Sequence, residues 1–286
     1  MKPVWISVAA AFAAVLGAAL FWAGYIYLSS EAVIQRRYPL PSTIAHPLQT
    51  QESITQGKHL AKVLGCFDCH GSDLRGQMLT PHPSFAIASS NLRRPASELS
   101  DKDIVRAMRF GLRSNGTSIW VMPSASYVFM RDADMDALIS YLRSLPSSSQ
   151  APVSPSFSFN ARRTIVAEDI APAAMSVLST DTPIDLGPHY GGGRYIARTS
   201  CAECHGLDLN GSADKRVPAL DGVLHYSLGD FFSLMRRGYV AGHHPQPEMS
   251  RLAKARFHEF ADYEVVALYQ YLYVRAVALP VSGTPR

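Results

Sequence analysis

The chain begins with a long apolar stretch. No charged residue lies between Val4 and Leu28, and about 25 helical residues are enough to cross a hydrocarbon core of roughly 30 Å. We therefore predict a transmembrane anchor over residues 1–30, followed by a juxtamembrane segment over residues 31–52. A cleaved signal peptide is the alternative, with Gly17-Ala18-Ala19 as a tolerable cleavage site, but the apolar run continues beyond those residues.

Beyond this stretch, apolar residues recur at helical spacing, and the pattern occurs twice. Residues 104–111 and residues 231–238 are each predicted to form an amphipathic helix that ends at a glycine. Each is followed by a capped closing helix, predicted over residues 133–145 and residues 265–272. The pattern predicts a mainly α fold.

The segments around the cysteines repeat as well. Cys66-x-x-Cys69-His70-Gly71-x-Asp73-Leu74-x-Gly76 returns as Cys201-x-x-Cys204-His205-Gly206-x-Asp208-Leu209-x-Gly211. Four of the matching positions, Gly71, Asp73, Leu74 and Gly76 with their counterparts, lie outside the Cys-x-x-Cys-His pentapeptides. Self-similarity of this extent indicates that one structural unit occurs twice.

The repeat sets the expected domain boundaries. We predict domain 1 over residues 53–146 and domain 2 over residues 190–277. Residues 147–189 are predicted to be a linker, because this segment starts with an extended run of proline and serine. Residues 278–286 are expected to form a C-terminal tail.

All four cysteines of the chain belong to the two Cys-x-x-Cys-His pentapeptides. This pattern attaches c-type haem, because both thiols form thioethers to the porphyrin and the histidine then ligates the iron. A thioredoxin-like redox site would need a βαβ context that neither motif has. A four-cysteine zinc site normally draws on one compact module, whereas these pairs lie more than a hundred residues apart. We therefore predict two covalently bound haem c groups, held by Cys66, Cys69, Cys201 and Cys204, with His70 and His205 as iron ligands.

A methionine is expected as the sixth iron ligand in each domain, because a thioether stabilises ferrous iron and blocks oxygen chemistry. Met122 and Met249 follow the glycines that end the two amphipathic helices, Gly111 and Gly238, at the same interval. These two methionines are therefore the predicted ligands.

Each methionine has a competitor. Met122 is preferred to Met130, because the proline after Met122 favours the extended backbone of a ligand loop. Met249 lies close to His243 and His244, and an imidazole in the sixth position would lower the reduction potential. The second sixth ligand is therefore Met249 or one of these histidines, with Met249 favoured by the interval.

Composition excludes one class of partner and helps to place the chain. The net charge is +4, only 17% of residues are charged, and no run of Lys and Arg is present. Nucleic acid is therefore an unfavoured partner. Because haem is attached to thiols outside the cytoplasm, we expect a single-pass protein of the bacterial inner membrane with its haem domains on the periplasmic side.

These motifs resemble tandem class I cytochrome c domains, in particular those of the membrane-associated cytochrome c subunits of bacterial alcohol and gluconate dehydrogenase complexes. The resemblance covers about residues 50–275 and is carried by the pentapeptides, Ser90-Asn91-Leu92, Arg109-Phe110-Gly111, Met122-Pro123 and Phe157-Ser158-Phe159-Asn160. That family's longer subunits usually carry a third haem domain and a carboxy-terminal anchor, whereas this sequence has two haem motifs and an amino-terminal apolar stretch.

The resemblance implies a membrane-anchored dihaem cytochrome that transfers electrons between a periplasmic dehydrogenase or cytochrome and a respiratory-chain acceptor. Its expected partners are membrane lipid, through the N-terminal helix, and redox proteins of a membrane complex. No side chain need act as acid, base or nucleophile, so no catalytic residue is predicted. The alternative is a haem enzyme, such as a dihaem peroxidase or sulfur-compound oxidase, which would need an open sixth position on one iron. A haem-bearing structural or sensor subunit is a third interpretation.

Overall fold

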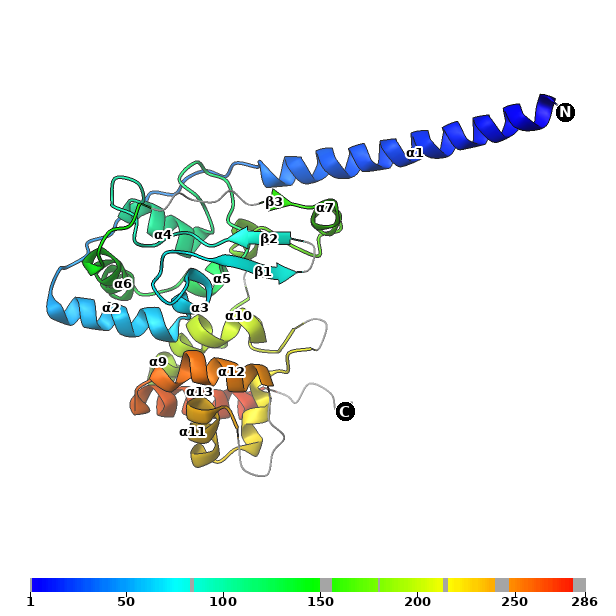
Figure 1. Ribbon diagram of the computed structural model, residues 1–286. Helices are drawn as coiled ribbons and strands as arrows, with labels where there is room; N and C mark the ends of the chain where they lie inside the picture. Colours follow the sequence, from blue (N-terminus) through cyan, green and yellow to red (C-terminus); the bar gives the residue numbers. More distant parts are fainter. Residues whose placement is uncertain are drawn as a thin grey trace.

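The computed structural model describes residues 2–82, 85–149, 156–179, 181–212, 216–239 and 247–279. A long N-terminal helix projects away from a body of two lobes, one containing α2 to α8 and the other α9 to α13 (Figure 1). The predicted mainly helical fold is confirmed. We call the two parts of the body the N-terminal lobe and the C-terminal lobe.

The projecting helix, α1 (Lys2–Ile34), is apolar around its whole circumference. Its stretch Trp5–Ile34 has a mean hydropathy of 2.1, and none of its most apolar window is buried within the protein. Large side chains such as Trp5, Phe12 and Phe21 are exposed. By length and composition this helix can cross a membrane, and it continues four residues beyond the end predicted from the apolar run.

The N-terminal lobe is built from short helices and a small antiparallel sheet. Its elements in chain order are α2 (Gln51–Val63), α3 (Cys66–His70), β1 (Met78–His82), β2 (Phe85–Ala88), α4 (Asp101–Phe110), α5 (Ser124–Tyr127) and α6 (Asp132–Ser144). The predicted helix that ends at Gly111 is α4, and a capping box of Ser100 and Asp103 begins it. Gly111 ends it with a φ of 63°, the left-handed cap that its position predicted.

The segment predicted as a linker contains structure that packs on the N-terminal lobe. Its described elements are β3 (Ser156–Phe157), α7 (Phe159–Val166) and α8 (Ala173–Ser176), and β3 extends the sheet in the order β1-β2-β3. The ring of Phe157 lies 5.1 Å from that of the buried Trp120, and Ile165 is buried beside it. Because these side chains remove apolar surface from water, the segment is held to the lobe instead of hanging free.

Helix α7 also holds the base of α1. The guanidinium of Arg162 donates to the Ser30 hydroxyl at 2.9 Å and to the Glu31 carboxylate at 2.8 Å. The ring of Trp22 packs edge-on against Phe159, with centroids 5.5 Å apart. The orientation of α1 relative to the N-terminal lobe is therefore fixed by ionic and aromatic contacts together.

The C-terminal lobe repeats the order of helices seen in the first. Its elements are η1 (Pro188–Tyr190), α9 (Gly191–Ile196), the π-helical turn η2 (Ala197–Cys201), α10 (Ala202–His205), η3 (Leu220–His225), α11 (Leu228–Arg237), α12 (Pro247–Ala255), η4 (Phe257–Glu259) and α13 (Asp262–Ala278). Helix α11 begins with a capping box of Ser227 and Asp230 and ends at Gly238 with a φ of 78°. It thus has the same two ends as α4.

In each lobe the first and last helices cross at a glycine. A Cβ placed on Gly57 of α2 would lie 1.9 Å from the carbonyl oxygen of Ala137 in α6, and one on Gly193 of α9 would lie 2.1 Å from that of Ala267 in α13. Only glycine permits such close approach of two backbones. The two crossings are equivalent, which gives the sequence repeat a structural counterpart.

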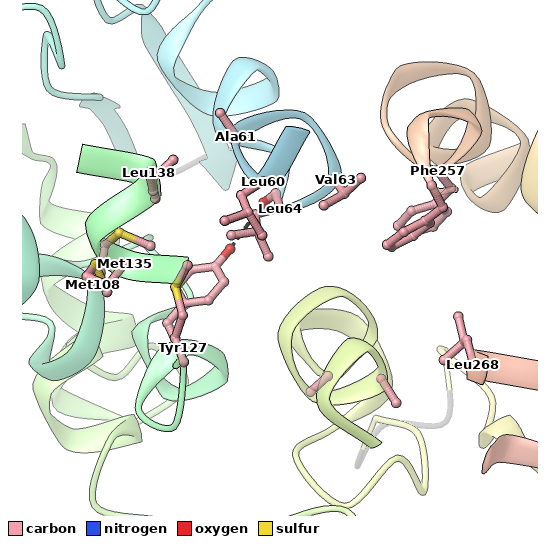
Figure 2. Close-up of a cluster of buried hydrophobic side chains, with 14 of the residues drawn as sticks. Leu60, Ala61, Val63, Leu64, Met108, Tyr127, Met135, Leu138, Phe257 and Leu268 are labelled. Atoms are coloured by element: carbon pink, nitrogen blue, oxygen red, sulfur yellow. Dashed lines mark hydrogen bonds between the residues drawn. The ribbon is translucent and has the colours of Figure 1, made fainter. Parts of the chain in front are cut away.

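The two lobes share one hydrophobic core. Buried residues from both lobes belong to a single cluster, among them Leu60 and Val63 of α2 and Leu268 of α13 (Figure 2). Polar contacts surround this core. Lys62 pairs with Glu259 at 2.5 Å, His59 with Glu264 at 3.0 Å, and the Tyr195 hydroxyl donates to Asp134 at 2.7 Å. The relative position of the lobes is therefore fixed by packing.

We expect Gly193→Ala to lower the stability of the protein by about 1–3 kcal/mol, because the new methyl group forces α9 and α13 apart. The control is Gly191→Ala in the same helix, where an added Cβ meets nothing within 4 Å and improves helix propensity. Urea unfolding of the detergent-solubilised full chain, followed by circular dichroism, measures both. Equal stability of the two variants would contradict the proposed close crossing.

The interface between the lobes is expected to weaken as pH rises. The hydrogen bond to Glu264 raises the pKa of His59 above its ordinary value of 6.5, so the charged pair contributes its full stability below that value and loses it as pH rises through the folded-state pKa. His59→Gln should therefore lower the thermal midpoint more at about pH 6 than at about pH 9. His46→Gln, at an exposed position, is the control; a pH-independent effect of His59→Gln would contradict the prediction.

Candidate haem attachment sites

The first pentapeptide forms a single helical turn between two glycines. Helix α3 spans Cys66–His70, and both flanking residues, Gly65 and Gly71, have positive φ values of 74° and 82°. Glycine is favoured on either side of the turn because it has no Cβ and so adopts a positive φ without steric strain. The turn places both cysteines and the histidine in one short segment, as attachment of one porphyrin requires.

The second pentapeptide has the same form, although the chain enters it differently. The π-helical turn η2 ends at Cys201, α10 then spans Ala202–His205, and Gly206 follows with a φ of 82°. The entering helix carries one residue fewer between its crossing glycine and the first cysteine than in the N-terminal lobe. Despite this difference, the two cysteines and the histidine again share one turn.

The loops after the two histidines adopt the same backbone conformation. Leu74 and Leu209 both lie in the left-handed region, with φ values of 60° and 66°, and both are almost fully buried. Gly76 and Gly211 donate their N–H groups to the carbonyls of His70 and His205, each at 2.8 Å. A non-glycine residue rarely adopts a positive φ, so its occurrence at the same place in both loops shows that the repeated sequence specifies one shape.

A main-chain carbonyl oxygen from later in the chain faces each histidine. His70 Nδ1 lies 2.7 Å from the carbonyl oxygen of Ser90, and His205 Nδ1 lies 2.8 Å from that of Pro218. A carbonyl can only accept, so Nδ1 carries the proton and Nε2 keeps its lone pair. Burial also lowers the pKa of both imidazoles. Both imidazoles are therefore favoured in the neutral form with a free Nε2 lone pair, the state in which a histidine can bind a metal.

The four cysteines do not have the properties of a redox pair or a zinc site. None forms a disulfide. Burial raises the pKa of Cys66 and Cys201 to about 12 and raises that of Cys69 and Cys204 as well, whereas a dithiol oxidoreductase lowers the pKa of its attacking thiol. Within the ranges that the structure describes, no three His, Cys, Asp or Glu side chains gather as metal ligands. The donor set fits covalent attachment of haem.

The predicted ligand Met122 lies in a loop that the structure ties to the first pentapeptide. Its side chain is half-buried against the shared core. Immediately after it, the Ser124 hydroxyl donates to the Ala107 carbonyl at 2.8 Å, and the Tyr127 hydroxyl donates to the Leu64 carbonyl at 3.1 Å, two residues before Cys66 (Figure 2). The competitor Met130 is only 2% exposed and belongs to the core. Met122 thus lies half-buried in a loop and Met130 is packed in the core, and the choice of Met122 as ligand stays a prediction.

The predicted ligand Met249 has a different local structure. It lies in the first turn of α12, half-buried against the shared core, and the hydroxyl of the next residue, Ser250, donates to the carbonyl of Gly238. The neighbouring Glu248 lies close enough to Cys204 to contribute to the raised pKa of that thiol, which is raised mainly by burial. His243 and His244 lie outside the described residues, so the choice between them and Met249 stays a prediction.

Sequence reasoning missed the residues that support the site. The carbonyls of Ser90 and Pro218 orient the histidines, but any residue can supply a carbonyl, so side-chain type gives no signal. Arg256 was also missed, and it pairs with both Asp68 and Glu203, one acid from each pentapeptide. The one available signal was that both motifs carry an acidic residue between their cysteines.

Comparison with known proteins agrees with this geometry. Residues 54–146 match the cytochrome c family. The chain is also similar to the fructose dehydrogenase cytochrome subunit of Gluconobacter japonicus, with 26% identity over 186 residues that cover 58% of this chain and 36% of that protein. The chain thus spans about a third of the length of this curated relative. Residues 54–146 therefore form a cytochrome c domain, which implies covalently bound haem c.

Proposed function

We propose that this protein is a membrane-anchored dihaem c-type cytochrome that carries electrons between a periplasmic dehydrogenase or another cytochrome and a respiratory-chain acceptor. One observation carries the proposal: the C-terminal lobe has the same attachment turn and histidine-to-carbonyl hydrogen bond as the cytochrome c domain, with Nδ1-to-oxygen distances of 2.8 and 2.7 Å. A second site with the same donor set supports a second haem.

Haem c, when bound, supplies reversible one-electron oxidation and reduction. The chain's own residues hold and orient it. In the proposal, Cys66, Cys69, Cys201 and Cys204 attach the porphyrins, while His70 and His205 offer Nε2 to the two irons. Met122 and Met249 would supply the remaining ligand to each iron, and a thioether ligand would favour the reduced state and block oxygen chemistry. No residue has to donate or remove a proton.

The proposed location follows from α1. An apolar helix of this length is stable in a bilayer, and Trp22, Tyr25 and Tyr27 near its end match the aromatic residues that favour a membrane interface. The ion pair between Arg162 and Glu31 holds the N-terminal lobe against this end of α1 at 2.8 Å. The haem domains are then on the periplasmic side of the bacterial inner membrane, where covalent haem attachment takes place.

The proposed partner is a dehydrogenase, as a subunit of a membrane complex. The similarity to a fructose dehydrogenase cytochrome subunit supports this class of partner. Co-purification from native membranes, followed by reduction of the haem on addition of the dehydrogenase substrate, tests the assignment. Purified chain that carries one haem or none would contradict the dihaem proposal itself.

Substitution of the proposed sixth ligands should change the absorption spectrum in a defined way. Met122→Ala and Met249→Ala should each remove about half of the long-wavelength band from methionine sulfur to ferric iron, because each removes one of two axial thioethers. Met175→Ala, at an exposed position, is the control and should keep the full band. Wild-type protein with a high-spin haem that binds carbon monoxide readily would instead favour the haem enzyme, such as a peroxidase or sulfur-compound oxidase.

Removal of either cysteine pair should leave one covalent haem per chain. The double variants Cys66→Ala/Cys69→Ala and Cys201→Ala/Cys204→Ala each lose the thioethers of one site. Mass spectrometry of the denatured protein, produced in a host competent in haem maturation, counts the haems that remain. A double variant with as many covalent haems as the wild type would exclude the substituted pentapeptide as an attachment site.

A further inference from the structure

The two attachment turns meet at one buried side chain. Arg256, between α12 and η4, is only 7% exposed. Its Nε lies 3.1 Å from an oxygen of Asp68, and its Nη1 lies 3.2 Å from an oxygen of Glu203. The contact with Glu203 is a hydrogen bond, and that with Asp68 is an ion pair. One guanidinium therefore holds an acid from each pentapeptide.

The two acids occupy the same position in their motifs. Asp68 is the third residue of Cys66–His70, and Glu203 is the third residue of the pentapeptide that ends at His205. Each thus lies between the two cysteines that hold a porphyrin. A bridge between these positions therefore joins the two attachment turns to each other.

Gly65, just before the first attachment turn, leaves space for the guanidinium of Arg256 because it has no side chain. A Cβ added to Gly65, the residue before Cys66, would lie 2.7 Å from Nη1 of Arg256 and 2.8 Å from its Cζ. The guanidinium therefore packs directly against the backbone that begins this turn. Arg256 also lies close enough to all four cysteines that its charge opposes the burial that raises the pKa of each thiol.

We propose that Arg256 is a positioning residue that holds the two haem attachment turns side by side, so that an electron passes directly between the two haems. This inference rests on the proposed dihaem function. In the step, one ferrous iron is oxidised as one ferric iron in the other lobe is reduced, and no bond or proton is transferred. Arg256 does not itself gain or lose an electron. Its role is to set the distance between the two attachment turns.

The electrostatics of the cluster favour this role. Arginine presents a planar fork that can contact two carboxylates at once, which the single ammonium of a lysine does less well. Without the guanidinium, Asp68 and Glu203 would be two partly buried like charges that repel each other. Loss of Arg256 should therefore move the two turns apart as well as remove a contact.

Other contacts hold the lobes together without joining the turns. His59 pairs with Glu264 and Lys62 with Glu259, but none of these four residues belongs to a pentapeptide. Of the ion pairs found in the described ranges, those of Arg256 are the ones that link one attachment turn to the other. Substitution at Arg256 can therefore change the spacing of the turns while the lobes stay associated.

The experiment compares Arg256→Met and Arg256→Lys with Arg251→Met in the full-length holoprotein. Arg251 lies in α12, is exposed, and pairs with Glu248 in the same helix, so its loss removes one positive charge from nearly the same place. Two haems held close together give a split circular dichroism signal in the Soret region. The rate of electron exchange between the haems is measured by flash reduction, and their midpoint potentials by redox titration.

Wild type and Arg251→Met should carry two haems and show the split signal. Arg256→Met should keep two haems and unchanged axial-ligand absorption, but lose most of the splitting and slow the exchange by roughly 10-fold, because transfer rates respond steeply to small displacements. Both potentials should fall, because a positive charge that favours ferrous iron is lost. Arg256→Lys should keep the potentials near wild type but recover only part of the splitting.

Several results would overturn the inference. One is a wild-type protein that carries two haems but shows no split Soret signal. The others are an Arg256→Met variant that keeps the full split signal, and an Arg251→Met variant that loses as much of it as Arg256→Met does. If Arg256→Met does not mature, Glu203→Gln releases one turn while it leaves the cysteines and His205 intact, and it must reduce the splitting too. A wild-type chain with one haem would contradict the dihaem function, and that result is distinct from all of these.

Discussion

The hydrogen bond from each histidine Nδ1 to a main-chain carbonyl is the interaction on which the proposed sites depend. It fixes the tautomer and the ring orientation, and so determines where Nε2 points. The segment that carries each carbonyl is bonded to the leucine of positive φ in the loop after the histidine, since Leu92 donates its N–H to Leu74 and Leu220 donates to Leu209. The buried side chains of Leu74 and Leu209 offset the cost of this unusual backbone by filling the core. Local geometry and global packing therefore depend on each other at both sites.

Much of the site could be predicted because its chemistry lies in short segments. Attachment of a porphyrin needs two thiols and a histidine on one turn, so the pentapeptides indicate candidate attachment sites without tertiary information. The glycine ends of α4 and α11 were also predictable, since a left-handed cap depends on one residue and its neighbours. The extent of α1 was nearly correct for the same reason, because apolar length alone decides whether a helix can span a bilayer. The predicted cap of the closing helix was wrong, because Asp132 is the first residue of α6, and Arg131 before it makes no side-chain cap.

The rest depends on contacts between distant residues, which a single sequence does not display. Strand β1 contains Pro81, which argues against a strand when read locally, and β3 has only two residues. The structure of residues 156–179 follows from packing of Phe157 and Ile165 against the lobe. The Pro- and Ser-rich run that precedes these residues had instead predicted an extended linker without structure of its own. Arg256 contacts a residue 53 positions away, and no periodicity could indicate that pairing.

The shared core changes what a two-lobe electron carrier can do. Two domains on a flexible linker would meet by diffusion, and their encounter rate would depend on linker length. Here Val63 of the N-terminal lobe and Phe257 of the C-terminal lobe belong to one cluster of buried residues, so the lobes are already docked. In the proposed dihaem protein, the entropic cost of bringing the two attachment turns together is then met once, during folding, and not in each electron transfer. Apolar packing supplies most of the association free energy but is not directional. The charged contacts at its edge, which require specific atoms to meet, are what select one relative orientation of the lobes among those that would bury a similar area.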